Sequence, residues 1–379
     1  MKICFLTTGD IVSIGQIKRA TGMAVPLADL GVEVSIVLLD TINNRARVKL
    51  ECPEANILWF SQSNMLLEVM QKNRLIKKLN PDLVYVSTFG FRNFILDILS
   101  KRRTYVVEHS ELGSSFKDST LLKRSSVLML EHVSILLFSG HIVASMYLKK
   151  HFESHGITSF LGKRKILYSP YAYSTQLNKV DVELSNLLKK QIKGRKVITY
   201  MGTLVRNYGI FEIIKAVEQL TKKYNNFLLV VIGGGVDKDF MLSEIRSKNL
   251  DNYVHVAGYV DEKYLATYFL VTDVFIAPLK NTIQDWARCP SKIFMYLPFN
   301  KPIVTCDIGE SRVLFSEQDF FYQPEDAKSM ANALSNAMAI EKDWEAHIDV
   351  NLHTWDYRAG DFLNWVSVNW GVVNEQSVD

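Results

Sequence analysis

The sequence predicts an α/β protein built from two doubly wound domains in tandem. Three observations carry this prediction: the length of 379 residues, the alternation of strand and helix patterns, and a second such series that begins near residue 197. A chain of this length exceeds one ordinary core and fits two domains. Hydrophobic residues make up 48% and charged residues 22%, which is typical of a folded globular protein and excludes a disordered one.

The first series starts at the amino terminus. Lys2–Thr7 is typical of a buried strand, Lys18–Leu30 of an amphipathic helix that stops at Gly31, and Val32–Leu39 of a second strand. A strand–helix–strand order implies a parallel sheet with helices on its faces. The same pattern predicts strands at Leu83–Ser87, Thr104–Glu108 and His141–Ser145, and helices at Phe91–Arg102 and Ser119–Phe138.

A connection and a second series follow. Residues 161–196 contain the chain-breaking Ser169-Pro170 and a polar, helix-prone segment, Lys179–Lys190. The strands predicted after it are Val197–Met201, Phe227–Ile232, Val254–Ala257, Val274–Ala277 and Ile303–Thr305. The helices predicted between and after them are Glu212–Lys223, Lys238–Lys248, Tyr264–Phe269 and Ser291–Leu297.

These patterns predict a first domain over residues 1–170, a linker over 171–196 and a second domain over 197–354. Ligands of doubly wound sheets bind beyond the carboxyl ends of the strands. We therefore expect the functional site in a cleft where the two domains face each other.

Positive charge is concentrated in the first half of the chain. Residues 1–170 carry 22 Lys and Arg against 14 Asp and Glu, whereas residues 171–379 carry 22 against 26. The cations form runs such as Lys77-Lys78, Lys101-Arg102-Arg103 and Lys163-Arg164-Lys165. Such runs fit a solvated surface, or contact with an anionic membrane or a phosphate-bearing acceptor.

The four cysteines are scattered, without the spacing of metal ligands, which is typical of reduced thiols in a cytoplasmic protein. The apolar run after Met1-Lys2 is too short for a signal peptide, and Val133–Leu148 is too short to cross a bilayer. We therefore expect neither a secretion signal nor a membrane-spanning segment.

Candidate site residues in the second domain lie at the predicted carboxyl ends of strands. Gly202 to Gly209 precedes a helix, where Arg206 could contact phosphate; the alternative is a tight turn with a solvated arginine. Ser291 and Lys292 fall in the first turn of a helix, where a cation is unfavourable unless an anion lies nearby. Arg288 and Lys292 could together bind a diphosphate, or could be ordinary surface cations.

Four further residues follow predicted strands or lie in the first loop. Gly234, in a run of three glycines without dinucleotide-binding spacing, would keep side chains away from a ligand. Glu310 could accept hydrogen bonds from sugar hydroxyls or cap the next helix. His109 ends a strand, so that structural and catalytic roles are equally open. Gly15 could offer backbone amides to phosphate or sugar.

Together these motifs resemble the retaining glycosyltransferases of the GT-B fold, in particular family 4 and its bacterial polysaccharide and glycolipid type. The strongest match is Pro290–Leu297, read PSKIFMYL, followed by Lys301-Pro302-Ile303-Val304. Val254–Val260, Gly309-Glu310 and Val143–Leu148 also follow the running order of the family. The resemblance covers nearly the whole chain and is strong over residues 197–311.

The resemblance implies two Rossmann-like domains that face each other across a cleft. The implied reaction is transfer of a hexosyl-type sugar from a UDP- or GDP-linked donor to a hydroxyl of a glycan or lipid-linked acceptor, with retention at the anomeric carbon. It implies no cofactor, no bound metal and no nucleic-acid partner. A last helix, near residues 355–372, would return to the first domain, whose basic surface would face a membrane. We expect a cytoplasmic location, with the inner face of the membrane as a further expectation.

The resemblance also assigns the candidate residues. Arg206 and Lys292 would stabilise the departing diphosphate, and His109 would lie against the sugar or the acceptor. The implied donor contacts are Gly15, Gly202, Arg206, Gly234, Arg288, Ser291, Lys292, Met295 and Glu310.

The sequence departs from the family where two glutamates eight positions apart are usual. These positions hold Ala287 and Met295, although Asp285 could serve nearby, and the usual lysine before Gly209 is Tyr208. Two alternatives follow from these departures. One is a protein of this fold that has lost turnover and acts as a binding or scaffold subunit. The other is a sugar-nucleotide epimerase, which would have a more acidic site.

Overall fold

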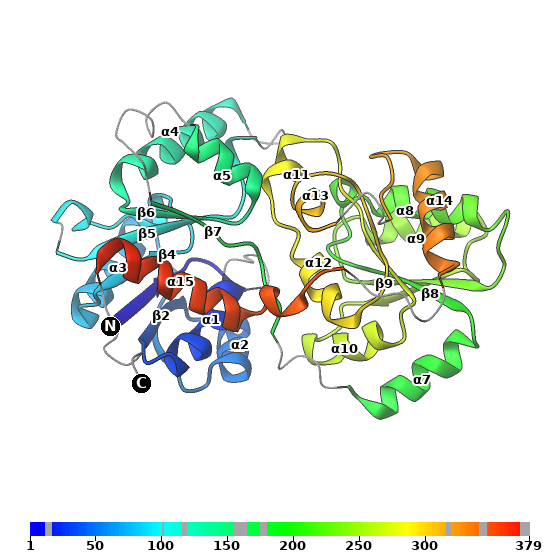
Figure 1. Ribbon diagram of the computed structural model, residues 1–379, viewed down its shortest axis with the longest axis horizontal. Helices are drawn as coiled ribbons and strands as arrows, with labels where there is room; N and C mark the ends of the chain where they lie inside the picture. The colour runs from blue at the N-terminus through cyan, green and yellow to red at the C-terminus, as the bar shows by residue number, and fades with distance from the viewer. Residues whose placement is uncertain are drawn as a thin grey trace. The chain divides into compact units, whose positions relative to one another are not determined.

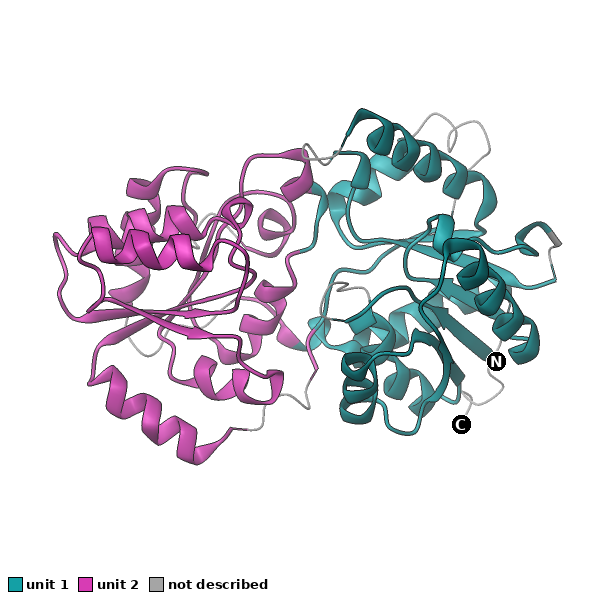
Figure 2. Ribbon diagram, turned by 180° about the vertical axis from the view of Figure 1, so that it is seen from behind, with its two compact units in different colours: residues 1–172, 287–289, 351–379 teal, residues 173–286, 290–350 magenta. Residues whose placement is uncertain are grey.

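The computed structural model describes residues 1–11, 17–100, 102–115, 120–154, 165–174, 180–315, 320–340 and 347–371. The chain forms two compact units, coloured separately in Figure 2. Unit 1 comprises Met1–Ala172, Ala287–Cys289 and Asn351–Asp379, and unit 2 comprises Tyr173–Trp286 and Pro290–Val350. Each unit is built on one parallel sheet with helices on its faces, which is the predicted α/β class (Figure 1).

The sheet of unit 1 has seven parallel strands in the order β3-β2-β1-β4-β5-β6-β7. Alternate residues of β1 belong to different clusters, with Ile3 and Phe5 on one face and Cys4 and Leu6 on the other. Both faces are therefore buried, as parallel sheets require. The strands are β1 (Lys2–Leu6), β2 (Glu33–Leu39), β3 (Asn56–Phe60), β4 (Leu83–Val86), β5 (Thr104–His109), β6 (Gly140–Val143) and β7 (Lys165–Tyr168).

Helices cover both faces of this sheet. The cluster on one face includes residues of α1, α2 and α15. The cluster on the other face includes Ile76 of α3 and Phe138, which caps the carboxyl end of α4. The carboxyl-terminal helix α15 packs along α1, where the ring of Trp355 lies 5.7 Å from the guanidinium of Arg19. The helices are α1 (Ile17–Asp29), α2 (Ile42–Glu51), α3 (Met65–Leu79), α4 (Leu121–Leu137), α5 (Met146–Glu153) and α15 (Trp355–Trp370).

The sheet of unit 2 has five parallel strands in the order β10-β9-β8-β11-β12. The strands are β8 (Lys196–Met201), β9 (Phe227–Ile232), β10 (Val254–Gly258), β11 (Val274–Ala277) and β12 (Ile303–Thr305). The helices are α7 (Val182–Ile192), α8 (Ile210–Leu220), α9 (Lys238–Ser247), α10 (Glu262–Leu270), α11 (Ile283–Ala287), α12 (Ser291–Tyr296), α13 (Glu310–Leu314) and α14 (Ala327–Met338).

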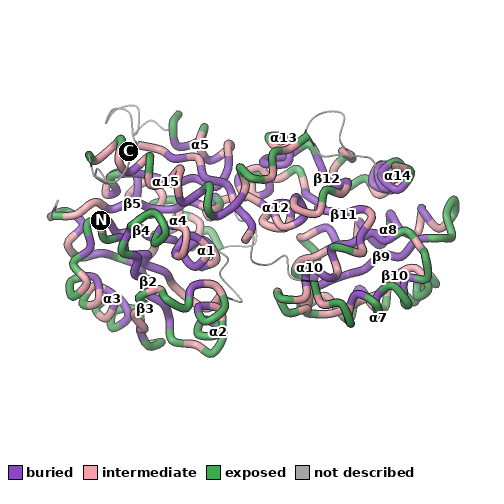
Figure 3. The backbone as a smooth tube through the Cα atoms, turned by 60° about the horizontal axis from the view of Figure 1, so that its bottom comes forward, coloured by how far each residue is buried: buried purple, intermediate pink, exposed green. Residues whose placement is uncertain are grey.

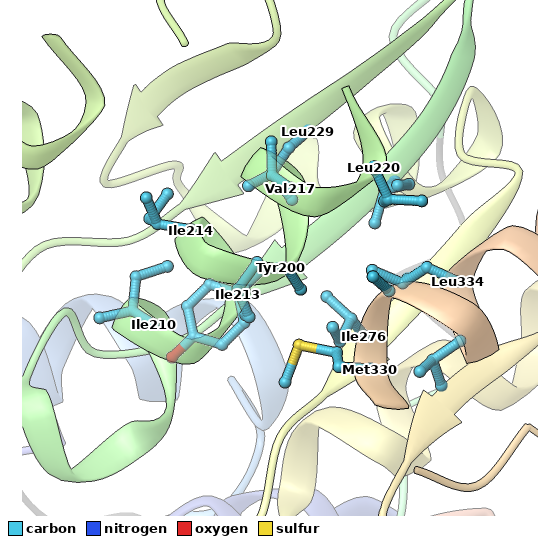
Figure 4. Packing of buried hydrophobic residues seen from close by; sticks show 14 of the residues in the cluster. Tyr200, Ile210, Ile213, Ile214, Val217, Leu220, Leu229, Ile276, Met330 and Leu334 are labelled. Atoms are coloured by element: carbon cyan, nitrogen blue, oxygen red, sulfur yellow. The ribbon is translucent and has the colours of Figure 1, made fainter. Parts of the chain in front are cut away.

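The core of unit 2 forms where α8 and α14 pack on the sheet. Figure 4 shows Ile213 and Val217 of α8 close to Met330 and Leu334 of α14, with Tyr200 of β8 among them. Apolar residues recur every three or four positions along α8, which gives this helix one continuous buried face. Buried residues follow the strands of both sheets in Figure 3, and exposed residues gather on the outer sides of the helices.

The sequence prediction was wrong in two places. The helix predicted over Phe91–Arg102 is absent, and the chain forms two 3-10 turns instead, η1 (Phe91–Asn93) and η2 (Ile98–Ser100). The side-chain amide of Asn73 hydrogen-bonds the backbone of Phe94 and Leu96, so contacts with α3 replace helical ones. The predicted connection over residues 161–196 also contains a strand that was not predicted, the four-residue β7, which pairs with β6.

The sequence patterns left residues 40–82 without predicted elements, and the structure places α2, β3 and α3 there. Within the described residues, no helix is both long enough and apolar enough to cross a membrane.

Candidate functional site

The sheet of unit 2 has a topological switch point beside its first strand. Chain order runs outward from β8 through β9 to β10 on one side, and β11 and β12 lie on the other. Loops that leave β8 and β11 therefore diverge at their carboxyl ends, which is where doubly wound sheets bind ligands. Gly202 follows β8 directly, and Gly233 follows β9.

Glycines bring these two loops into close contact. A Cβ atom on Gly233 would lie 2.0 Å from the carbonyl oxygen of Gly202, and one on Gly235 would lie 2.3 Å from that of Leu204. Larger residues at either position would force the loops apart. By contrast, a Cβ atom on Gly234 would meet nothing within 4 Å. Gly234 therefore borders open space while its neighbours hold the two loops together.

Lys292 brings positive charge to the end of β8. Its Nζ lies 2.9 Å from the position that a Cβ atom of Gly202 would occupy, and 4.5 Å from the ring centroid of Tyr200. The predicted pair Gly202 and Lys292 thus meets in the folded chain, although the two residues are 90 positions apart in the sequence. An ammonium group beside backbone amides at a switch point suits the binding of a phosphate-bearing ligand.

Tyr296 fixes α12, and with it Lys292, against β8. Its hydroxyl accepts a hydrogen bond from the backbone N–H of Met201 at 2.9 Å. Its ring stacks on Phe275 of β11, with centroids 4.2 Å apart. Tyr296 is completely buried, and burial raises the pKa of its hydroxyl. The hydroxyl therefore stays protonated and holds the helix in a defined position.

Arg206 lies elsewhere on the loop that follows β8. Its backbone N–H donates to Asp237 at 2.7 Å, and its guanidinium lies over the rings of Phe211 and Phe240, 5.5 and 5.1 Å from their centroids. Arginine stacks readily on aromatic faces and can still present its N–H groups to a ligand. Arg206 is exposed, so its phosphate-binding role stays a prediction.

Ala287 and Met295 stand where the glycosyltransferase family that the sequence resembles usually has glutamate, and both have apolar surroundings. Ala287 is fully buried in a cluster with Val143 and Leu148 of unit 1. Met295 lines a pocket of unit 2 with room for about one water molecule, about 20 Å³. The other residues of this pocket are Tyr173, Ser174, Glu262, Leu265, Ala266, Phe269, Pro298 and Phe299.

Two carboxylates of unit 2 are buried near the ends of β11 and β12. Glu310 opens α13 and is completely buried. Asp285, 4% exposed, accepts a hydrogen bond from the backbone N–H of Lys280 at 2.6 Å, which closes the loop before α11. Ser291, in the first turn of α12, is half-buried. A contact of Glu310 or Ser291 with a donor stays a prediction.

His109 lies in unit 1 and packs into its core. Its Nε2 lies 3.1 Å from Nδ1 of His141, and its ring centroid lies 4.2 Å from that of Phe152. His109 is only 9% exposed. Burial, with smaller contributions from His141 and His151, lowers the pKa of His109 well below its usual range. The imidazole is therefore neutral at physiological pH, and only its Nδ1 remains for another partner.

This burial predicts how stability changes with pH. In the unfolded chain His109 takes up a proton below about pH 6.5, whereas the folded chain resists doing so, and stability falls as the pH drops. We expect His109→Gln to lose about 1 kcal/mol less unfolding free energy than the wild type between pH 7 and pH 5.5, measured by urea denaturation. His347→Gln, at an exposed position, serves as the control. Equal losses for wild type and His109→Gln would contradict this interpretation.

Two remaining predicted residues lie outside this part of unit 2. Arg288 groups with unit 1, where it interacts electrostatically with Glu111. Gly15 lies outside the described residues. Sequence reasoning overlooked Tyr200 and Tyr296, which hold Lys292 and α12 in place. The PSKIFMYL motif includes Tyr296, but no local pattern links it to Met201.

Within the described ranges, no three side chains of His, Cys, Asp or Glu gather in a way that could hold a metal ion.

Comparison with known proteins agrees with this arrangement. Residues 187–349 match the family described as glycosyl transferases group 1. The 2-deoxystreptamine N-acetyl-D-glucosaminyltransferase of Niallia circulans is 22% identical over 99 residues, covering 26% of this chain and 25% of that protein. An uncharacterized glycosyltransferase of Methanocaldococcus jannaschii is 26% identical over 182 residues, covering 46% and 42%. The matches thus span less than half the length of either curated relative.

The fold matches over nearly the whole chain. The crystal structure of HepE of Anabaena in complex with UDP and glucose superposes with a TM-score of 0.70 at 16% identity, covering 98% of each chain. The protein therefore has the GT-B fold of glycosyltransferases. The region similar to glycosyl transferases group 1, residues 187–349, covers most of the second unit and includes Gly202 and Lys292.

Proposed function

We propose that the protein is a glycosyltransferase that uses a nucleoside-diphosphate sugar as its donor. The observation that carries this proposal is the Lys292 ammonium beside Gly202 at the carboxyl end of β8, within the region similar to glycosyl transferases group 1. The structural neighbour HepE binds UDP and glucose, which supports a donor of this class. UDP- and GDP-linked sugars are the first candidates.

The reaction breaks the bond between the anomeric carbon and the diphosphate and forms a bond to an acceptor hydroxyl, which loses its proton. Negative charge grows on the departing diphosphate, and a preorganised cation stabilises that charge in the transition state. We assign this role to Lys292, with Arg206 as a second cation on the adjacent loop. Retention at the anomeric carbon, a hexosyl-type sugar and family 4 membership belong to the same proposal, as does a glycan or lipid-linked acceptor.

Turnover tests this proposal directly. Incubation with UDP- and GDP-sugars and an alkyl-glycoside or lipid acceptor should release nucleoside diphosphate, and proton NMR of the first-formed product should show the donor's anomeric configuration. Excess EDTA should leave the rate unchanged, since the mechanism assigns no step to a metal. Donor binding without turnover on any acceptor would favour a binding subunit. Interconversion of donor sugars without transfer would favour an epimerase. The sequence similarity to named glycosyltransferases favours neither alternative.

We also propose that unit 1 contacts a membrane surface through α4. Leu121 and Leu122, in the first turn of this helix, are 79% and 83% exposed and lie next to Lys123 and Arg124. Apolar side chains next to cations suit the interface of an anionic bilayer. The basic run at residues 101–103 suits this contact less well, because Arg103 is largely buried and pairs with Asp97 at 3.5 Å. Lys101, Lys163 and Arg164 lie outside the described residues.

Co-sedimentation with phosphatidylglycerol vesicles tests this contact. We expect the combined variant Leu121→Ser, Leu122→Ser, Lys123→Glu to bind several-fold less than the wild type, because it loses both apolar and electrostatic attraction. Leu50→Ser, at a half-exposed leucine of α2, is the matched control. Equal binding by all three proteins would exclude α4 as the contact. A location in the cytoplasm, at the inner face of the membrane, is part of this proposal.

A further inference from the structure

Helix α3 of unit 1 exposes large apolar side chains along its first two turns. These exposed side chains are Met65, Leu66, Leu67 and Met70. The side of the helix that packs into the core carries other apolar residues, among them Val69 and Ile76. An amphipathic helix at the surface of a domain normally turns its apolar residues to the core and its polar residues to solvent. The packing of unit 1 therefore does not account for the exposed apolar residues of α3.

A second group of exposed apolar side chains lies beside α3, in the segment 91–99. Its members are Phe91, Phe94, Leu96 and Leu99. The side-chain amide of Asn73 donates to the carbonyl oxygen of Phe94 at 2.9 Å and accepts from the N–H of Leu96 at 2.8 Å. The Nζ of Lys72 donates to the carbonyl oxygen of Arg92 at 3.1 Å. Residues 92–96 thus run along α3, and the two groups form one surface, which we call the α3 patch.

Buried polar contacts hold the α3 patch in a fixed shape. Lys72 is buried and donates to Oε1 of Glu68 at 2.6 Å and to Oδ1 of Asn93 at 2.7 Å. The amide of Asn93 donates in turn to the carbonyl oxygen of Thr88 at 2.8 Å. Arg92 forms an ion pair with Glu68. Because these contacts order the surface in advance, a partner that covers it pays little for immobilising the chain.

The size of the α3 patch suits an interface between two proteins. Its eight apolar residues are between 41% and 76% exposed. At about 150 Å² for a fully exposed side chain of this size, the patch exposes on the order of 700 Å². The largest apolar patch of a typical monomer covers about 300–600 Å², and a standard interface buries about 800 Å² on each partner. The patch therefore exceeds what a monomer usually exposes and approaches what a stable dimer buries.

The composition of the α3 patch favours a protein partner over a lipid surface. The centres of protein interfaces are enriched in Phe, Met and Arg and depleted of Lys, Glu and Asp. Proteins at a membrane interface are anchored instead by Trp and Tyr. Residues 63–73 and 91–99 contain neither Trp nor Tyr. Lys72 and Glu68, which fall within this stretch of α3, are both buried and paired with each other.

The charges of α3 are compatible with a second copy of the same chain in one orientation. The exposed cations of the helix, all in its carboxyl-terminal half, are Arg74, Lys77 and Lys78. At a rise of 1.5 Å per residue, Lys77 lies about 16 Å along the helix from Leu66. If two α3 helices pair antiparallel through their first two turns, these cationic ends point away from each other. Within each copy, Glu68 pairs with Arg92.

We propose that the α3 patch is a dimer interface, through which two copies of this chain associate with two-fold symmetry. Such symmetric contacts are the commonest in homo-oligomers, and they bring the same surface of both copies together. In this arrangement the first two turns of α3 and the segment 91–99 of one copy cover the same residues of the other. The apolar side chains that unit 1 leaves exposed are then buried by association.

Sedimentation velocity of the full-length protein over a range of concentrations tests this proposal. We expect a dimer with a dissociation constant in the micromolar range or below. Leu66→Glu should weaken association by roughly 100-fold or more, because two-fold symmetry places the added carboxylate twice in one interface. Leu96→Glu should have the same effect from the segment 91–99. Leu187→Glu, at a half-exposed leucine of α7 in unit 2, is the matched control and should leave the dimer unchanged.

These variants should remain folded. Leu66 is largely exposed, and a glutamate in the first turn of a helix interacts favourably with the helix dipole. Circular dichroism of Leu66→Glu and Leu96→Glu checks this directly. A loss of the dimer in a folded variant then reports on the α3 patch itself.

Three results would overturn the proposal. One is a wild-type protein that stays monomeric at about 100 µM, well above the dissociation constant expected for an interface of this size. The second is a dimer that both Leu66→Glu and Leu96→Glu leave unchanged, and the third is a dimer that Leu187→Glu weakens equally. If the wild type is monomeric and Leu66→Glu loses binding to phosphatidylglycerol vesicles, the patch faces a membrane instead. None of these results depends on the proposed glycosyltransferase activity.

Discussion

Lys292→Ala should weaken nucleoside-diphosphate binding by roughly 10- to 150-fold, because a hydrogen bond to a charged group contributes about 1.5–3 kcal/mol. The turnover rate should fall by roughly 100- to 1,000-fold, which is typical when a group that stabilises transition-state charge is removed. The Lys292 Nζ lies at the Gly202 loop, where the diphosphate of a donor would meet the end of β8. Isothermal titration and steady-state kinetics measure the two effects.

Two variants make this result specific. Lys292→Arg keeps the positive charge and should retain part of the binding, although the geometry of a guanidinium differs. Lys215→Ala removes a lysine from the exposed side of α8 in the same unit and should leave binding unchanged. Since Lys292 also lies over the ring of Tyr200, the unfolding midpoint of Lys292→Ala must be compared with that of the wild type. Undiminished affinity in a folded Lys292→Ala protein would remove this residue from the donor site.

Glu108→Ala should destabilise unit 1 by about 3–5 kcal/mol, because removal of one partner leaves a buried charge uncompensated. The Arg19 Nε lies 3.0 Å from Glu108, and both side chains are at most 3% exposed. The Arg19 guanidinium also donates to the hydroxyl and carbonyl oxygens of Ser169 at 2.9 and 2.8 Å. This network therefore joins α1, β5 and the residue that follows β7. Chemical denaturation monitored by circular dichroism measures the loss.

The matched control is an ion pair at the surface of the same unit. Lys2 and Glu33 lie 3.1 Å apart, with side chains 53% and 58% exposed. Solvent screens such pairs, and Glu33→Ala should change the unfolding free energy by at most about 1 kcal/mol. If Glu108→Ala and Glu33→Ala cost the same, the buried network does not stabilise unit 1 as described.

Most of the second sheet could be predicted from the sequence because four of its five strands are largely buried on both faces. Phe227–Ile232 is an uninterrupted apolar run, and the predicted and observed bounds of β9 coincide. The segment Phe91–Arg102 also contains spaced apolar residues, but Asn73 of α3 hydrogen-bonds the backbone of Phe94 and Leu96, which are distant from it in sequence. Local periodicity does not contain that information. The edge strand β7 lies within the predicted connection and is only partly buried, unlike β9.

The candidate site was predictable only in part, for a similar reason. Parallel strands end at one edge of a sheet, and this brings Gly202 and Lys292 into one region of unit 2. The hydrogen bond from Met201 to Tyr296 and the stacking of Arg206 on Phe211 and Phe240 depend on side-chain directions across elements. The neutral, buried state of His109 depends on packing by Phe152, far along the chain.

The central claim, that unit 2 binds a nucleoside diphosphate, is tested most directly by thermal unfolding of the wild-type protein with UDP, GDP and ADP. A ligand that binds the folded state at 100 times its dissociation constant adds about 2.7 kcal/mol of stability. We predict that at least one of the three raises the unfolding midpoint by several degrees in the wild type and raises it clearly less in Lys292→Ala. An unchanged midpoint with all three nucleotides at millimolar concentration would contradict a nucleotide-sugar site in this chain.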